Sequence, residues 1–243
     1  MKVKLTVCYD GTNYCGWQIQ PNGLSVQQVV QEAIEKATGE NCKVVGSGRT
    51  DAGVHAQRQV AHFETNSSIP AERFYLALNA HLPSDVKVLA SEKAEDNFDA
   101  RKSAKRKTYC YSFYYGEVEN PLKERYAVRL EKEPNIEKIQ KAINLLVGEH
   151  DFKAFCSSGS GAKTTVRTIY SIDIEKGNDG LKVLVTGNGF LYNMVRILVG
   201  TLLDVGYGKK TEKDILEMLN QGKRERGGRT LPAKGLCLAN VEY

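Results

Sequence analysis

The chain has 243 residues, enough for one large domain or for two domains of about 120 residues each. Its apolar fraction of 41% and charged fraction of 26% are ordinary for a folded protein, and no window of about 18 uninterrupted apolar residues predicts a membrane span. The net charge of +5 supports an anionic partner only weakly, so the placement of the charges matters more than their sum.

Residues 3 to 9 alternate between apolar and polar side chains, which predicts a strand with one buried face. The same alternation excludes the continuous apolar core of a signal peptide, so we expect a cytoplasmic protein. The six cysteines form no CxxC pair and no metal-ligand spacing, and we expect them to be reduced thiols that fill small spaces in the core.

Helical spacing of the apolar residues begins after Ser25 and ends at Gly39, and Ser25 with Gln28 could form a capping box. This is the clearest helix in the sequence. The remaining elements predicted for the first half are strands near 42 to 46 and 57 to 64, a helix from 70 to 80, and a strand from 85 to 92.

A second unit begins with an alternating strand at 106 to 115, which places Tyr109, Tyr111, Phe113 and Tyr115 on one face. The elements predicted after it are a helix from Asn135 to Val147, strands at 165 to 175 and 181 to 187, an apolar helix at 190 to 205, a short helix opened by Thr211 and Asp214, and a last strand from Leu236.

Both halves therefore have the element order β-α-β-β-α-β, with one further helix in the second. This order predicts an α+β protein built from two ferredoxin-like (split βαβ) halves, each with helices on one face of a mainly antiparallel sheet. We expect residues 1–104 and 105–243 to form these halves and to meet at a central cleft that binds the ligand.

Basic residues gather in three groups, which together suggest a polyanionic partner. Each group alone is better explained as a solvated face, but lysine and arginine beside the aromatic strand would suit RNA, through phosphate contacts and base stacking. The groups are Arg101, Lys102, Lys105, Arg106 and Lys107; Lys163 and Arg167; and Lys209, Lys210, Lys213, Lys223, Arg224, Arg226 and Arg229.

The glycine-rich stretch GSGRTDAGVHA, residues 46 to 56, places Arg49 and Asp51 on either side of Thr50. It matches neither the phosphate-binding Walker pattern nor the GxGxxG dinucleotide pattern. Two interpretations stay open: a tight turn in which Thr50 and Asp51 bond their own backbone, or a site in which Asp51 is a nucleophile or base that Arg49 keeps ionised.

Several blocks, in order along nearly the whole chain, resemble the TruA family of bacterial tRNA pseudouridine synthases. The stretch GRTDAGVHA is specific by itself, and agreement of all the blocks is beyond chance. The blocks are YDGTNYCGWQIQP, GSGRTDAGVHA, QVAHF, LNAHLP, FDARKSA, GEHDFKAF, FLYNMVRILVGTLLDVG and KGLCL.

The resemblance implies an isomerase that converts uridine to pseudouridine in the anticodon arm of tRNA, at positions 38 to 40, without cofactor or metal. It implies that Asp51 attacks the flipped-out nucleotide, on either the base or the sugar, and that Arg49 pairs with Asp51 and fills the vacated place in the stem. It also implies a homodimer that holds one tRNA across both chains.

Further site residues follow from the resemblance. Tyr109 is similar to the tyrosine that stacks on the target base and takes part in proton transfer from C5, and Leu236 resembles the apolar residue that closes the pocket. Arg196 matches the arginine of the MVR block, and because it lies in an apolar helix we expect it to pair with a carboxylate such as Asp51. The expected tRNA contacts are Arg101, Lys105 and Arg106.

Two positions, Lys102 and Leu231, depart from the usual pattern of the family and leave the choice of target RNA open. Two rival functions are an RNA-binding module without catalysis and a carboxylate-dependent hydrolase. The first predicts that Asp51 is dispensable, and the second needs another acidic residue near Asp51, which the loop does not supply. We expect packing or capping roles for the histidines, which are His55, His62, His81 and His150.

Overall fold

The computed structural model describes residues 1–224 and 227–243, so the predicted basic contact Arg226 lies outside the described residues. The chain divides into two compact units. The first consists of Met1–Lys105 together with Cys237–Tyr243, and the second of Arg106–Leu236. Among the described residues, no helix has the length and apolar character needed to cross a membrane.

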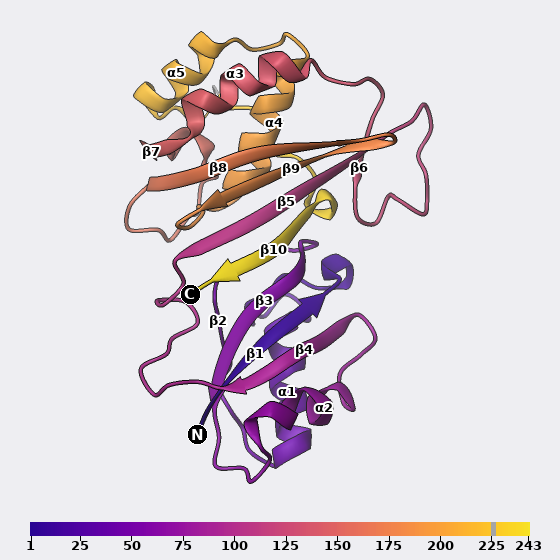
Figure 1. The fold of residues 1–243 in the computed structure, drawn as a ribbon, viewed down its shortest axis with the longest axis vertical. Coiled ribbons are helices and arrows are strands. Elements are labelled where there is room, and N and C mark those ends of the chain that lie inside the picture. Colours follow the sequence, from indigo (N-terminus) through magenta and orange to yellow (C-terminus); the bar gives the residue numbers. More distant parts are fainter. Residues whose placement is uncertain (225–226) are drawn as a thin grey trace. The chain divides into compact units, whose positions relative to one another are not determined.

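The first unit is a sheet with helices on one face (Figure 1). Its elements are β1 (Lys2–Tyr9), α1 (Val26–Thr38), β2 (Val45–Gly46), β3 (His55–Glu64), α2 (Phe74–Asn79), β4 (Val86–Lys93) and β10 (Leu236–Glu242). Strand β1 lies between β4 and β3 and is antiparallel to both, and β2 is antiparallel to β3. The predicted order β-α-β-β-α-β of the first half is confirmed.

Strand β1 shows how the sequence pattern produces this layer. Its side chains alternate between half-buried and buried positions, and Val3, Leu5 and Val7 are fully buried. Helix α1 is capped by Ser25, whose hydroxyl accepts a hydrogen bond from the Gln28 backbone N–H at 3.2 Å. The Gln28 side chain donates to Glu32, so the predicted capping box is only half formed.

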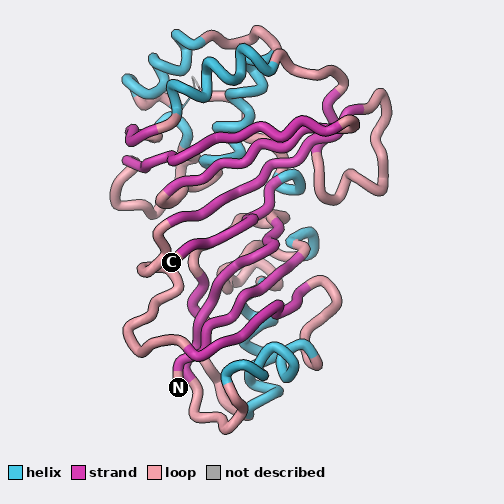
Figure 2. Tube along the Cα trace, in the orientation of Figure 1, coloured by secondary structure: helices cyan, strands magenta, loops and turns pink. Residues whose placement is uncertain are grey.

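The second unit contains β5 (Arg106–Tyr115), β6 (Val128–Leu130), α3 (Ile136–Leu146), β7 (Gly148–Asp151), β8 (Val166–Gly177), β9 (Gly180–Gly187), α4 (Met194–Gly206) and α5 (Glu212–Gln221). Its strands follow the order β5-β9-β8-β7, with antiparallel neighbours, and a long loop joins β5 to β6 (Figure 2). The caps predicted at Asn135 and Thr211 are confirmed. Strands β6 and β7 were not predicted, because three or four residues are too few to show alternation.

The last strand departs from the expected division of the chain. We expected it within a second half of residues 105–243, but Cys237–Tyr243 groups with the first unit. Its contacts give the reason: Cys237 pairs with His55 in a parallel register, the Lys105 N–H donates to the Glu242 carbonyl at 2.8 Å, and the Tyr243 hydroxyl donates to the Ala100 carbonyl at 2.7 Å.

Candidate active site

The loop that carries Asp51 joins β2 to β3 in the first unit. These strands pair antiparallel, with Val45 opposite His62. Within the loop, Arg49 is exposed, Thr50 is buried and Asp51 is half-buried. A partly accessible carboxylate on a loop between two paired strands can reach a substrate while its backbone is held in place.

Hydrogen bonds fix the backbone of this loop on both sides of Arg49. The Gln59 side-chain amide donates to the Gly48 carbonyl at 3.1 Å, and the Trp17 N–H donates to the Thr50 carbonyl at 3.0 Å. The Val54 N–H then donates to the Asp51 carbonyl at 3.1 Å. The two peptide groups that flank Asp51, one on each side of its Cα atom, are therefore held in fixed orientations.

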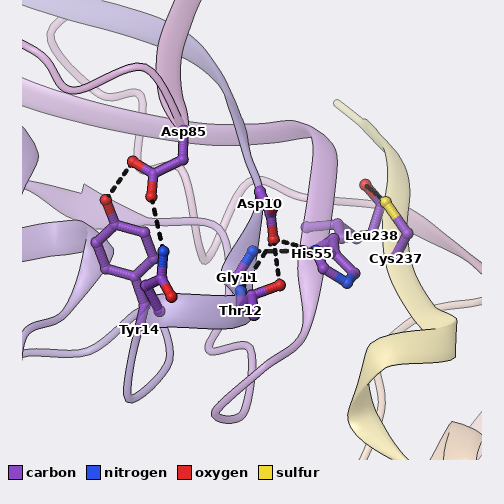
Figure 3. A network of polar contacts seen from close by, with 9 residues as sticks. Asp10, Gly11, Thr12, Tyr14, His55, Asp85, Cys237 and Leu238 are labelled. Atoms are coloured by element: carbon purple, nitrogen blue, oxygen red, sulfur yellow. Dashed lines mark hydrogen bonds and ion pairs between the residues drawn. The ribbon is translucent and has the colours of Figure 1, made fainter. Parts of the chain in front are cut away.

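The segment that follows β1 packs against the end of the loop (Figure 3). Its short 3-10 turn, Gly11–Asn13, is capped by Asp10, which accepts from the Thr12 N–H at 3.0 Å. The Gly11 N–H donates to Nδ1 of buried His55 at 3.0 Å, and a Cβ on Gly11 would lie 2.0 Å from the Val54 carbonyl oxygen. This close approach requires glycine and joins the turn to the start of β3. The same Nδ1 lies 3.2 Å from Asp10 Oδ1, and the packing or capping role expected for His55 stays a prediction.

Tyr109 lies in the second unit, on β5 opposite Val185. Its ring is 8% exposed and meets Phe190 edge to face, with the ring centroids 5.2 Å apart. Tyr111, on the same face of β5, is fully buried, which agrees with a core role for most of this aromatic row.

Arg196 lies in the first turn of α4 and is half-buried. Its Nε donates to the Leu231 carbonyl at 2.6 Å, and its Nη1 donates to Asn193 Oδ1 at 2.7 Å. These acceptors explain how the helix accommodates a guanidinium among apolar residues. Asp51 belongs to the first unit and Arg196 to the second, so the pairing of the two stays a prediction, as does the pairing of Arg49 with Asp51.

Leu236 is buried and follows a turn that the second unit holds tightly. The Tyr111 hydroxyl donates to the Pro232 carbonyl at 2.6 Å, and a Cβ on Gly235 would come within 2.6 Å of the Tyr111 ring. Lys234 forms an ion pair with Glu124 from the loop after β5. These contacts fix the backbone immediately before Leu236.

The basic residues differ in exposure and in their contacts within the protein. Arg101, Lys105 and Arg106 are exposed, and the Arg106 guanidinium lies 4.9 Å from the centroid of the Tyr170 ring. Arg224 instead donates to the Gly228 carbonyl and to Thr230, which makes it a structural residue of its own loop. Within the described part of the chain, no group of three or more His, Cys, Asp or Glu residues could hold a metal ion.

Sequence patterns alone did not predict that Tyr9 and Gln59 support the loop. Alternation predicts that Tyr9 faces the core with Val7, but it does not reveal a partner for the hydroxyl. In the structure this hydroxyl lies 2.8 Å from Thr50 Oγ1, and Gln59 Oε1 accepts from the Ser47 hydroxyl at 2.6 Å.

Comparison with known proteins assigns the chain to a family. A family model described as tRNA pseudouridine synthase matches residues 5–101 and 142–243, and the chain belongs to this family.

Full-length relatives agree with the assignment. The chain is 46% identical to tRNA pseudouridine synthase A 2 of Clostridium perfringens and 47% identical to tRNA pseudouridine synthase A of Thermoanaerobacter sp., in each case over 99% of both chains. A solved Cbf5-Nop10-Gar1 complex aligns with a TM-score of 0.38 and 15% identity over 97% of this chain and 57% of that chain, a likeness too distant to add to the assignment.

Proposed function

We propose that this protein is an isomerase that converts uridine to pseudouridine in the anticodon arm of tRNA, at positions 38 to 40, with Asp51 as nucleophile. The observation that carries the proposal is the half-buried carboxylate of Asp51 on a loop whose peptide groups are fixed on both sides, in a chain of the tRNA pseudouridine synthase family.

The reaction breaks one bond and makes another without net change in atoms or electrons. The bond from N1 of uracil to C1′ of ribose breaks, the base turns, and C5 bonds to C1′. The proton leaves C5, and N1 carries a proton in the product. A carboxylate that attacks the nucleotide and later leaves supplies the temporary bond that lets the base turn.

The target nucleotide must leave the stem before a side chain can reach it. Arg49 is exposed beside Asp51, which suits its proposed role of filling the vacated place. We assign Tyr109 to stacking on the uracil and to proton transfer from C5, Leu236 to the apolar contact that closes the pocket, and Arg196 to the charge partner of Asp51. The fixed backbone before Leu236 and the half-buried position of Arg196 support the last two assignments.

For substrate binding, we propose that Arg101, Lys105 and Arg106 contact phosphates of the tRNA. Their exposure and positive charge are the support. We further propose a cytoplasmic homodimer of two split βαβ halves per chain. The antiparallel order of β4, β1, β3 and β2 supports the first half, and that of β5, β9 and β8 supports the second.

Tritium release from unmodified tRNA labelled at C5 of uridine tests the proposal. Release is expected with wild-type protein, and mapping of the product should place pseudouridine at positions 38 to 40. A matched tRNA with cytidine at these three positions should release no tritium. Binding of tRNA without release would overturn the isomerase, and release that persists with the cytidine-substituted tRNA would overturn the choice of positions.

A further inference from the structure

Four polar side chains are buried where the loop that carries Asp51 packs on its neighbours: Ser47 and Thr50 belong to the loop, and Tyr9 and Gln59 belong to β1 and β3. Ser47 and Gln59 are fully buried, Tyr9 is 3% exposed and Thr50 is 5% exposed. Buried polar groups are costly unless they are hydrogen-bonded, and each of these four has a partner. Hydrogen bonds are directional, so a buried polar cluster of this kind fixes the orientation of its side chains and backbone more strictly than apolar contacts would.

Tyr9 reaches the loop from the last position of β1. The Tyr9 hydroxyl lies 2.8 Å from Thr50 Oγ1. The strand pairing shifts here: Val7 pairs with Gln59, but Tyr9 pairs with Ala56. Such irregularities re-aim side chains, and this one lies where β1 meets the start of β3.

Thr50 is consequently held at two points. Its hydroxyl contacts Tyr9, and its carbonyl accepts the Trp17 N–H at 3.0 Å. The next peptide leads directly to Asp51, so the two contacts set the direction in which the chain enters that residue. A shift of about 1 Å in a reacting group can reduce a rate by about a hundredfold.

The sheet has other sources of stability at this point. Strands β1 and β3 pair along Lys2 to Val7, and the apolar side chains Val3, Leu5 and Val7 are fully buried behind them. The hydroxyl pair of Tyr9 and Thr50 adds one neutral hydrogen bond to this interface. Its specific effect is on the loop rather than on the strands.

We propose that Tyr9 and Thr50 are positioning residues, whose hydroxyl contact orients the backbone of Asp51 for attack. The proposal rests on the proposed function, because it concerns the same carboxylate. It adds a buried support, drawn from a different strand, to the residues assigned to the reaction.

A double-mutant cycle with Tyr9→Phe, Thr50→Val and the combination tests the proposal, with kcat, KM and the melting temperature measured for each protein. We expect each single variant to lower kcat about tenfold while KM stays within about a factor of two. The double variant should be no slower than either single variant, because one contact is lost in all three. Thr50→Ser keeps the hydroxyl and should retain most of kcat.

Tyr14→Phe is the matched control. It also removes a tyrosine hydroxyl of the first unit, which donates to Asp85 at 2.7 Å, and it should leave kcat unchanged. Unchanged kcat in Tyr9→Phe or Thr50→Val, additive losses in the double variant, or an equal loss in Thr50→Ser would each overturn the proposal. Failure of the wild type to isomerise tRNA would instead reject the proposed function, so the two failures are distinguishable.

Discussion

Gly16 shows how one residue can determine the conformation of the loop. Its φ of +109° lies in the region that favours glycine, and a Cβ there would stand 2.5 Å from the Thr50 carbonyl oxygen. That oxygen is the acceptor of the Trp17 N–H, so a methyl group would displace the peptide that precedes Asp51.

Gly16→Ala is therefore expected to lower the free energy of unfolding by about 2 kcal/mol or more, and to lower kcat as well. Gly39→Ala is the control, because Gly39 also has positive φ, +75°, but a Cβ there meets nothing within 4 Å. It should cost only about 1 kcal/mol and leave kcat unchanged. Urea unfolding and steady-state kinetics measure both effects. Equal behaviour of the two variants would count against the steric account.

His62 gives a pH dependence of stability whose sign follows from its burial. Burial lowers the pKa of His62 below its ordinary value of 6.5, and the Ala100 N–H donates to Nδ1 at 3.1 Å. The nearby charges are Asp99 and Glu64, which raise the pKa, and Lys2, which lowers it. Because the unfolded chain binds this proton more readily, the contribution of His62 is fully present above pH 6.5 and is lost as pH falls through the folded pKa.

The variant His62→Gln keeps an acceptor but cannot titrate. We expect the free energy of unfolding of the wild type to fall more than that of the variant between about pH 7.5 and about pH 5. Urea unfolding at both pH values measures the difference. Parallel pH profiles for the two proteins would show that His62 does not contribute.

Among the helices and strands, the sequence predicted the helix starts, which depend on local capping residues. It did not predict the partner of the last strand, which depends on contacts far along the chain. Helices α1, α3 and α5 begin at the predicted residues because each has a capping side chain immediately before it. The position of β10 depends on its partner β3 rather than on its own residues, so its grouping with the first unit could not be derived from alternation.

In the candidate site, the motif singled out Asp51 and Arg49 as candidates, but the contact of Tyr9 with Thr50 spans 41 residues of sequence. The local alternation of apolar and polar residues contains no information about a contact between residues so far apart in the sequence. The predicted core role of Tyr111 was recoverable, because alternation on β5 places it on the buried face.

A substitution at Tyr243, the residue after β10, tests whether the last strand belongs to the first unit. Its ring lies 5.0 Å from that of Phe98 and its hydroxyl donates to the Ala100 carbonyl. Tyr243→Ala should lower the free energy of unfolding by about 2 kcal/mol. Hydrogen exchange should become faster at residues 98 to 100 and in β3 but not in α3. Faster exchange in α3 alone would refute the assignment.

At the scale of the whole molecule, the positive charges predict how tRNA binding responds to salt. Lysine and arginine release counterions when they neutralise phosphates, so affinity should fall linearly on a logarithmic plot against salt concentration. Arg106→Gln should reduce the magnitude of the slope by about one and weaken binding to all tRNAs alike. Lys36→Gln, on the exposed last turn of α1 and outside the three basic groups, removes the same charge and is the control for altered charge alone. An unchanged slope for Arg106→Gln would exclude a phosphate contact at this residue.

The proposed reaction depends above all on the carboxylate of Asp51. The most direct measurement is single-turnover tritium release from C5-labelled tRNA with wild-type protein and with Asp51→Asn, which keeps the size of the side chain and removes its charge. We expect rapid release by the wild type, and no release by Asp51→Asn while tRNA affinity and melting temperature are retained. Release by the folded variant at the wild-type rate would show that the Asp51 carboxylate is not the nucleophile.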